Sequence, residues 1–209
     1  MENYISINGK KTQLTPEQLE KLKAIFTVPE TKLADIPVGG VFTVEGHQMI
    51  VLEQFGDTTL AIRKDLLPDQ TFGENNNFAK SEVLKTCDKF ADEIAAAVGA
   101  ENIVKHDLDL TANDGLKDYG ILTERRASLL TADMYRKYVL NLDKFNPEQW
   151  WWLATPDSTK THKNDRWTLC VAPSGYVIFG NDAYRYYCYG VRPFLILKSS
   201  IFESLESGQ

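Results

Sequence analysis

Residues 150 to 198 are the most informative part of the chain for its fold. They open with the apolar run W-W-W-L-A-T-P (150–156), pass through two short β patterns and the segment N-D-A-Y-R-Y-Y-C-Y (181–189), and close with the apolar strand G-V-R-P-F-L-I-L-K (190–198). Short apolar runs separated by turn residues predict antiparallel strands. Between these runs lie Tyr, Trp, Asn, Asp and Arg, which are enriched at contact surfaces. We therefore expect a C-terminal β region that displays an aromatic and polar surface.

The size and composition of the chain suit one compact domain. Its 209 residues are 43% hydrophobic, and a chain of this length buries enough surface to form a core without metal or disulfide staples. No Gly/Ser-rich or Pro-rich linker divides the sequence. We expect an N-terminal hairpin and helix over residues 1–30, one compact unit over residues 31–203 and a flexible tail over residues 204–209.

Charge and cysteine content restrict the partners and the compartment. The net charge of -6 and the isoelectric point near 5.2 disfavour nucleic acid, because phosphates require a basic surface that the sequence lacks. Anionic membranes are disfavoured for the same reason, and no apolar run is long enough for insertion into a bilayer. Cys87, Cys170 and Cys188 are widely spaced, and the first residues lack the features of a signal peptide. We expect a protein that is cytoplasmic as synthesised and carries no cofactor.

The N-terminal segment predicts a hairpin and then a helix. Asn8-Gly9 suits a two-residue turn between two short strands, since both positions of such a turn require positive φ. Thr15-Pro16-Glu17-Gln18 has the pattern of a capping box with proline at the first helical position. We expect the helix to end at Phe26.

The middle of the chain predicts three further strands and two more helices. Three β-rich runs between residues 41 and 64 are separated by Gly46 and Gly56-Asp57, which indicates an antiparallel meander. Apolar residues at helical spacing follow Ser81 and stop at Gly99, and a similar run follows Thr131. With irregular strands between these helices, the fold class is α+β, with helices beside antiparallel sheet.

Six motifs carry a resemblance to a known family. They are L-A-D-I-P-V-G-G-V-F (33–42), N-N-F-A-K-S-E-V-L (76–84), L-T-A-D-M-Y-R-K-Y (130–138), W-W-W-L-A-T-P (150–156), S-G-Y (174–176) and G-V-R-P-F-L-I-L-K-S-S-I-F (190–202). They resemble an uncharacterised family that is common in bacterial prophages and gut bacteria. The resemblance covers most of the chain from about Leu33 to Phe202.

The resemblance implies a fold and a mode of action. The C-terminal half of that family is similar to the C-type-lectin-like fold of formylglycine-generating-enzyme relatives and of the variable proteins of diversity-generating retroelements. In those variable proteins, mutagenesis at template adenines randomises exposed positions just before a fixed closing strand, and the randomised residues bind ligand. Here G-V-R-P (190–193) stands in the place of the fixed strand, and the Tyr-rich segment stands in the place of the variable one.

The residue types of this segment support the same interpretation. Tyrosine supplies large contact area at low rotamer entropy, and Asn, Asp and Arg add directional hydrogen bonds. Arg185, Tyr186 and Tyr187 cannot all face a core, whereas strand alternation leaves a buried position open for Trp167 and Phe179. The candidate ligand-binding residues are Asn164, Asp165, Trp167, Tyr176, Phe179, Asn181, Asp182, Tyr184, Arg185, Tyr186, Tyr187 and Tyr189.

The triple tryptophan and Arg192 are interpreted as structural. Trp150 and Trp152 share one strand face and Trp151 lies on the other, so at least one face is expected to be buried. Arg192 precedes Pro193 in the closing strand, and we expect it to pair with a buried carboxylate or with carbonyl groups.

No pattern typical of an enzyme is found. The glycine-rich, zinc-protease and serine-hydrolase motifs are missing, and the histidines His47, His106 and His162 lack metal-ligand spacing and are expected to be exposed or half-buried. Cys170 and Cys188 lie on separate predicted strands, unlike the close cysteine pair that formylglycine-generating enzymes use.

A calcium site is also disfavoured. Asn164-Asp165 resembles a ligand-bearing dipeptide of C-type lectins, but the E-P-N or Q-P-D triplet of those lectins is missing, and calcium requires six or more oxygen ligands. Asn75, Asn76 and Asn77 precede a helix, where asparagines are ordinarily turn and cap residues.

The sequence therefore predicts a binding protein and not an enzyme. The hypothesis is a prophage-encoded display protein, such as the variable protein of a diversity-generating retroelement, that binds an unidentified protein or glycan through its Tyr-rich surface. One alternative is a carbohydrate-binding or carbohydrate-processing protein of fixed specificity that uses Asp157, Asp165 and Asp182. Another is a structural phage component whose aromatic residues are buried in a homo-oligomer. Location on the virion or in the host cytosol stays open.

Overall fold

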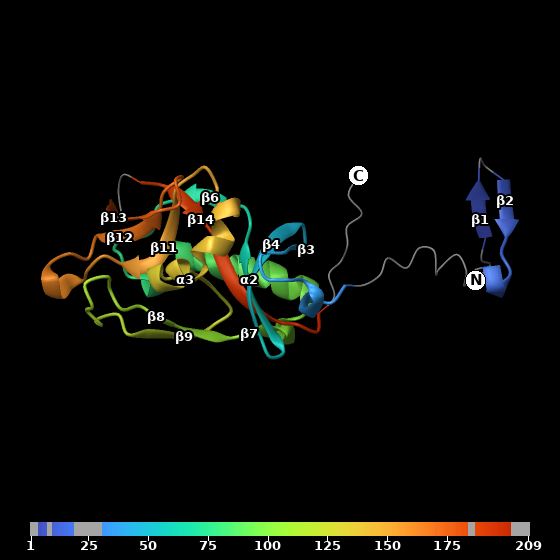
Figure 1. Cartoon of the computed structure of the whole chain (residues 1–209), viewed down its shortest axis with the longest axis horizontal. Coiled ribbons are helices and arrows are strands. Elements are labelled where there is room, and N and C mark those ends of the chain that lie inside the picture. Colours follow the sequence, from blue (N-terminus) through green and yellow to red (C-terminus); the bar gives the residue numbers. More distant parts are fainter. Residues whose placement is uncertain (1–3, 8–9, 19–30, 184–186, 202–209) are drawn as a thin grey trace.

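The computed structural model describes residues 4–7, 10–18, 31–183 and 187–201 (Figure 1). The predicted tail over 204–209, the Asn8-Gly9 turn and most of the predicted first helix lie outside these residues. In Figure 1, β3 and β4 lie toward one end of the domain and β12 and β13 toward the other, with α2 and α3 between these ends. The architecture is mixed α+β with mostly antiparallel sheet, as the sequence predicts.

The N-terminal hairpin and the start of the helix that follows it are confirmed. Strand β1 (Tyr4–Ile7) pairs antiparallel with β2 (Lys10–Gln13). The amide of Gln18 donates to Thr15 Oγ1 at 3.2 Å, and the amide of Thr15 donates to Gln18 Oε1 at 3.0 Å. These reciprocal bonds are those of a capping box.

A six-stranded sheet forms the first layer. The predicted meander gives β3 (Val41–Val44), β4 (His47–Phe55) and β5 (Thr58–Arg63). Beyond β5 the sheet continues with the C-terminal strand β15 (Pro193–Lys198) and then with β10 (Ala127–Leu129), while the short β7 (Ile103–Val104) also pairs with β15. The closing strand therefore pairs with a strand from the first third of the chain.

A five-stranded sheet contains most of the strands formed by residues 150–198. Its order is β13 (Val177–Asp182), β12 (Trp167–Val171), β11 (Trp151–Pro156), β14 (Tyr189–Val191) and β6 (Leu67–Gln70). Strands β11 and β14 run parallel, and the other pairs in this sheet are antiparallel. A separate hairpin of β8 (His106–Asp109) and β9 (Ile121–Arg125) accounts for the region that the sequence left irregular.

Both helices begin where their capping residues predict, and α2 also ends at its predicted glycine. Helix α2 (Glu82–Val98) is capped by Ser81, which accepts from the Leu84 amide at 3.0 Å, and Gly99 at positive φ ends it. Helix α3 (Ala132–Leu142) follows Thr131, which accepts from the Met134 amide at 3.2 Å. Helix α2 packs against β3, β10, β14 and β15, and α3 packs against β11.

Short 3₁₀ helices complete the fold. They are η1 (Leu33–Asp35), η2 (Phe78–Lys80), η3 (Ala100–Asn102), η4 (Asp143–Phe145) and η5 (Lys160–His162). No helix in the described part of the chain combines the length and the apolar character needed to cross a membrane.

The closing stretch differs from the single strand that the sequence predicts. It is divided at Arg192 into β14 and β15, which belong to different sheets. Pro193 begins β15 and has no amide hydrogen to donate at the point of division. The buried Arg192 side chain connects the end of β5 with η4. It donates to the carbonyls of Arg63 at 2.8 Å, Lys64 at 3.0 Å and Phe145 at 2.9 Å. Its predicted pairing with carbonyl groups is confirmed.

The tryptophan prediction is also confirmed. Trp151 and Trp152 have no exposed surface. Trp151 packs edge-on against Tyr135 of α3, and the Arg192 guanidinium lies 5.2 Å from the Trp151 ring centre. On the other sheet face, Trp152 packs edge-on against Phe72 and donates from Nε1 to the Gln70 carbonyl at 2.8 Å. Both faces of β11 are therefore part of the core.

Candidate functional site

Aromatic residues form a row across one end of the five-stranded sheet. Gly190 donates to the Trp150 carbonyl and Ala172 donates to the Tyr176 carbonyl, which extends the ladders by one residue beyond the strand ends. The row runs from Tyr176 through Ala172 and Trp150 to Tyr189. Neighbouring strands lie about 4.8 Å apart, so Tyr176 and Trp150 are about 10 Å from each other along the row. Ala172, the small residue of the row, lies between them.

Tyr189 contacts several aromatic rings at this end of the sheet. Tyr189 lies almost parallel to Trp150, at 19° and 5.5 Å between ring centres. It also contacts Trp152 at 4.5 Å and Tyr187 at 5.7 Å. Because Tyr189 touches both Trp150 and Trp152, it lies on the sheet face that these two tryptophans share. We call Trp150, Tyr176, Tyr187 and Tyr189 the aromatic face.

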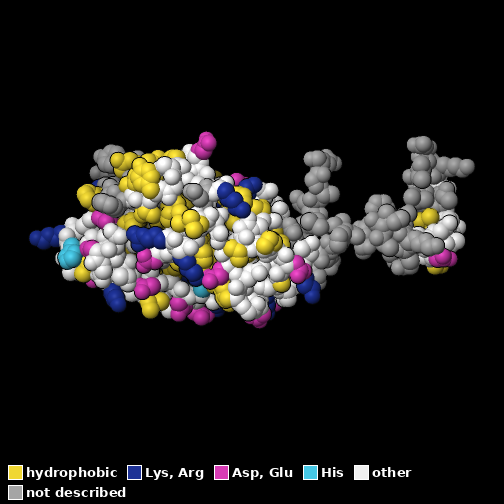
Figure 2. Space-filling view, viewed as in Figure 1, with side chains coloured by type: hydrophobic (Ala, Val, Ile, Leu, Met, Phe, Trp, Pro, Cys, Tyr) yellow, Lys and Arg dark blue, Asp and Glu magenta, His cyan; other side chains and the backbone are white. Residues whose placement is uncertain are grey.

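The outer members of the aromatic face are exposed, while its base is buried. Tyr176 is 59% exposed and Tyr187 is 42% exposed, whereas Tyr189 is 9% exposed. Figure 2 shows hydrophobic side chains gathered on this part of the molecule, over the region of β6, β13 and β14. Burial, and to a lesser degree the nearby Cys170 and Tyr187, raises the pKa of the Tyr189 hydroxyl, so this hydroxyl stays protonated near neutral pH. A neutral, buried ring therefore supports the exposed ring of Tyr187.

The structure does not bring all the candidate residues together. Trp167 is 46% exposed, but it lies five residues from Ala172 along β12, or about 16 Å. An odd separation also turns its side chain to the opposite sheet face. Phe179, Asn181 and Asp182 lie on β13, where the structure describes only their backbone. Tyr184, Arg185 and Tyr186 lie outside the described residues.

Asn164 and Asp165 lie away from the aromatic face, at a place where three loops meet. We call this place the loop junction and define it by residues 74–80, 111–120 and 157–166. Asp114 accepts from Ser158 and from His162 Nδ1, and Asp118 accepts from Thr159 at 2.5 Å and Thr161 at 2.6 Å. These hydrogen bonds lower the pKa of both carboxyl groups, so both remain ionised at neutral pH.

Asn76 is the centre of the loop junction. Its side chain is fully buried and donates to the carbonyls of Ser158 at 2.9 Å and Trp167 at 2.7 Å. The side-chain oxygen accepts from the Tyr119 hydroxyl at 2.7 Å, and the backbone amide of Asn76 donates to the Asp165 carbonyl at 2.8 Å. The sequence pattern predicts only turn and cap roles for Asn75, Asn76 and Asn77. Asn77 does cap η2, but Asn76 joins segments more than 80 positions away in the sequence, which local patterns cannot reveal.

The cysteines and histidines lie in different local environments. Cys170 is buried, and burial raises its thiol pKa to about 12, while Cys188 is exposed. His47 bonds Glu93 at 3.1 Å, and His106 bonds Ser128 at 3.0 Å. These two histidines are half-buried and His162 is exposed, as expected. Within the described residues, no group of three His, Cys, Asp or Glu side chains could hold a metal ion.

Comparison with protein-family models, with curated proteins and with solved structures found no match for the chain. The aromatic face and the loop junction are therefore assessed from their own geometry.

Proposed function

We propose that the chain is a C-type-lectin-like binding module that recognises a protein or glycan ligand through the aromatic face. The single observation that carries the proposal is the series of ring contacts in which exposed Tyr187 contacts buried Tyr189, which in turn contacts buried Trp152. The mechanism is recognition without chemistry: the rings exclude water from the contact, and neighbouring polar groups orient the ligand.

The arrangement of strands supports the finer assignment of the fold. A strand that precedes both long helices, β5, pairs antiparallel with the C-terminal strand β15. The strands β11, β12 and β13 between α3 and the closing stretch form consecutive antiparallel pairs. Antiparallel sheets with flanking helices are features of the C-type-lectin-like fold.

The ring contacts of Tyr187 and Tyr189 support a binding role. An exposed ring on a mobile loop loses conformational entropy when a ligand orders it, whereas a ring stacked on the core is already ordered. Tyr187 contacts Tyr189, and Tyr189 contacts two tryptophans of the sheet. Tyrosines of this kind combine apolar contact with a hydroxyl that forms hydrogen bonds.

A selection experiment tests the proposal. Peptides from a random displayed library and glycans from an array are selected for binding to the full chain, and their affinities are then measured for Tyr176→Ala/Tyr187→Ala. We expect the double variant to bind the selected ligands at least about tenfold more weakly, because two exposed aromatic contacts are removed. Trp167→Ala is the matched control, because it removes a similarly exposed ring of the same sheet, and it should bind as the wild type does.

Ligands that bind the double variant and the wild type equally well contradict the proposal. Concentration-dependent association that Tyr176→Ala/Tyr187→Ala abolishes favours instead the structural component, in which the aromatic face is buried between copies of the chain. Light scattering over a range of protein concentrations gives this result directly.

The prophage origin and the diversification of residues 160–195 belong to the same proposal. The exposed rings of the aromatic face precede or adjoin β14, the segment that the resemblance equates with the fixed strand. The test is the DNA beside the gene. A near-copy of the segment that encodes residues 160–195, differing at adenines and next to a reverse transcriptase gene, supports diversification, and its absence favours a module of fixed specificity.

A further inference from the structure

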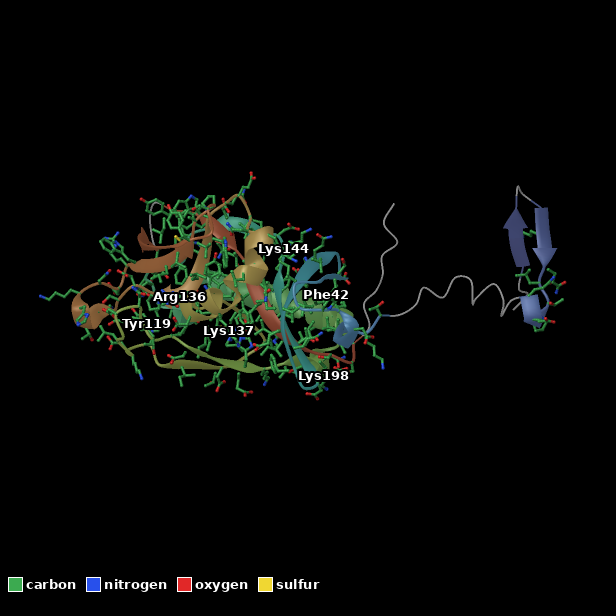
Figure 3. All side chains as sticks on the ribbon, in the orientation of Figure 1. Phe42, Tyr119, Arg136, Lys137, Lys144 and Lys198 are labelled. Atoms are coloured by element: carbon green, nitrogen blue, oxygen red, sulfur yellow. The ribbon has the colours of Figure 1, made fainter. Side chains whose placement is uncertain are left out.

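A pocket opens at the loop junction, away from the aromatic face. Its volume is about 210 Å³, which is smaller than the pockets that hold drug-sized ligands. Its walls come from all three loops, with Asn75, Asn77 and Lys80 on one side and Tyr119, Asp118, Lys160 and Asp165 on the others. Figure 3 shows Tyr119 toward the end of the domain opposite Phe42 and Lys198.

The walls of the pocket are held in place by hydrogen bonds. Asn76 lies between Asn75 and Asn77 in the sequence. Its side-chain oxygen accepts from the Tyr119 hydroxyl at 2.7 Å, and its backbone amide donates to the Asp165 carbonyl at 2.8 Å. Asp118 is fixed by Thr159 and Thr161 through Oδ2. Burial, with the nearby charges of Asp165 and Asp118, raises the pKa of the Tyr119 hydroxyl to about 12. The pocket is therefore formed before any ligand arrives.

Several polar groups in the pocket keep capacity for a ligand. Asp118 accepts the two threonine hydroxyls through Oδ2, and Asp165 contacts Lys160 through Oδ2. A carboxylate offers about four acceptor sites on two oxygens, so both groups can accept further hydrogen bonds. The side chains of Asn75 and Asn77 each accept one backbone amide through Oδ1, and their Nδ2 groups are donors. Acceptors and donors thus stand on different walls of one small pocket.

The charges in the pocket balance, which favours a neutral ligand. Lys80 and Lys160 offset Asp118 and Asp165. The lysines are long and flexible, and the Lys160 side chain is 80% exposed and 3.5 Å from Asp165, so they do not form a fixed site for an anion. The other groups of the pocket are amides, carboxylates and the half-buried Tyr119 ring. Amides and carboxylates suit hydroxyl groups, which donate and accept at once, and the ring suits an apolar C–H face.

We propose that the pocket of the loop junction binds a single ring of a neutral sugar directly, without a metal ion. Asp118 and Asp165 accept from the sugar hydroxyls, Asn75 and Asn77 donate to them, and Tyr119 contacts the ring. This site goes beyond the proposed function, because it uses no residue of the aromatic face.

Nuclear magnetic resonance of the ¹⁵N-labelled full chain tests the proposal. The protein is titrated with the methyl glycosides of glucose, galactose, mannose and N-acetylglucosamine, and with alanine as a zwitterion. At least one glycoside should produce saturable shifts confined to the amides of the loop junction, and a metal chelator should leave them unchanged. The absence of saturable shifts with all four glycosides, a stronger response to alanine at the same amides or a loss of binding with chelator overturns the proposal.

Variants distinguish sugar binding in this pocket from sugar binding elsewhere on the protein. Asp165→Asn should weaken glycoside binding about tenfold, because a hydrogen bond to a charged acceptor is replaced by a neutral one. Asn75→Ala should weaken it as well and covers the case in which Asp165→Asn disturbs the loop, which the amide spectrum reports. The matched control Asp133→Asn changes an exposed carboxylate on α3 and should have no effect. Tyr176→Ala/Tyr187→Ala should also bind the glycoside normally, whether or not the aromatic face binds ligand.

Discussion

Aromatic residues of the same sheet have opposite environments in this molecule. Trp151 and Trp152 in the middle of the five-stranded sheet are fully buried, whereas Tyr176 and Tyr187 at its end are 59% and 42% exposed. The difference is not one of residue type, since Trp167 at the start of β12 is 46% exposed. Position in the sheet decides whether a ring stabilises the fold or is available to a ligand. Four predictions test this contrast between buried and exposed positions.

The largest effect should come from the buried centre of the sheet. Trp151→Ala removes a ring that contacts Tyr135 and Arg192, and we expect the free energy of unfolding to fall by about 4 kcal/mol because a large cavity remains. Urea denaturation followed by circular dichroism measures the change. Trp167→Ala, the exposed counterpart, should cost less than about 1 kcal/mol. Equal losses for the two variants contradict the division between core and surface aromatics.

The second effect compares two neighbouring asparagines of the loop junction. Asn76→Ala leaves two carbonyls and the Tyr119 hydroxyl without the partner they have in the structure. We expect a loss of about 3 kcal/mol, because each buried group that loses its hydrogen bond costs about 1–3 kcal/mol. Asn75→Ala should cost less than about 1 kcal/mol. Urea denaturation of the two variants measures both losses. A small loss for Asn76→Ala shows that water readily replaces the hydrogen bonds of the Asn76 side chain.

The third effect is the dependence of stability on pH. Burial, and secondarily the charge of Arg125, lowers the pKa of His106 from 6.5 to about 4. Because the folded state binds this proton less readily than the unfolded state, the full contribution to stability is present above about pH 6.5. It is lost as the pH falls from 6.5 toward 4, by on the order of 3 kcal/mol. As the pH falls across this range, the melting temperature of His106→Gln should fall less steeply than that of the wild type. Equal slopes for the two proteins contradict the lowered pKa of His106.

The smallest effect on stability should come from the aromatic face. Tyr176→Ala/Tyr187→Ala should change the free energy of unfolding by less than about 1 kcal/mol, because both rings are largely exposed. The same variant should also lose binding of the ligands selected on the full chain. A loss of stability as large as that of Trp151→Ala indicates a structural role for these tyrosines and removes the basis for a binding surface.

Much of the fold could be predicted from local patterns. Ser81 and Gly99 mark the ends of α2, and Thr131 marks the start of α3, because capping depends on residues three or four positions apart. The meander of β3, β4 and β5 follows from alternating apolar residues and glycine turns. The burial of two adjacent tryptophans follows from the size of their apolar surface.

The candidate site was less predictable. The sequence grouped twelve residues because they are close together in the chain, but strand geometry places Trp167 about 16 Å from Ala172 of the aromatic row. It puts Asn164 and Asp165 in another region altogether. Trp150 was assigned to the core, yet it stacks on Tyr189 at the exposed end.

The two long helices, the meander of β3, β4 and β5 and the α+β class follow from the sequence alone, because these depend on neighbours along the chain. The division of the closing stretch between two sheets at Arg192 and the joining of three loops by Asn76 emerge only in the folded molecule. The same is true of which tyrosines reach the surface. These features depend on contacts between segments far apart in sequence, where the requirement that buried polar groups form hydrogen bonds selects partners that no local pattern contains.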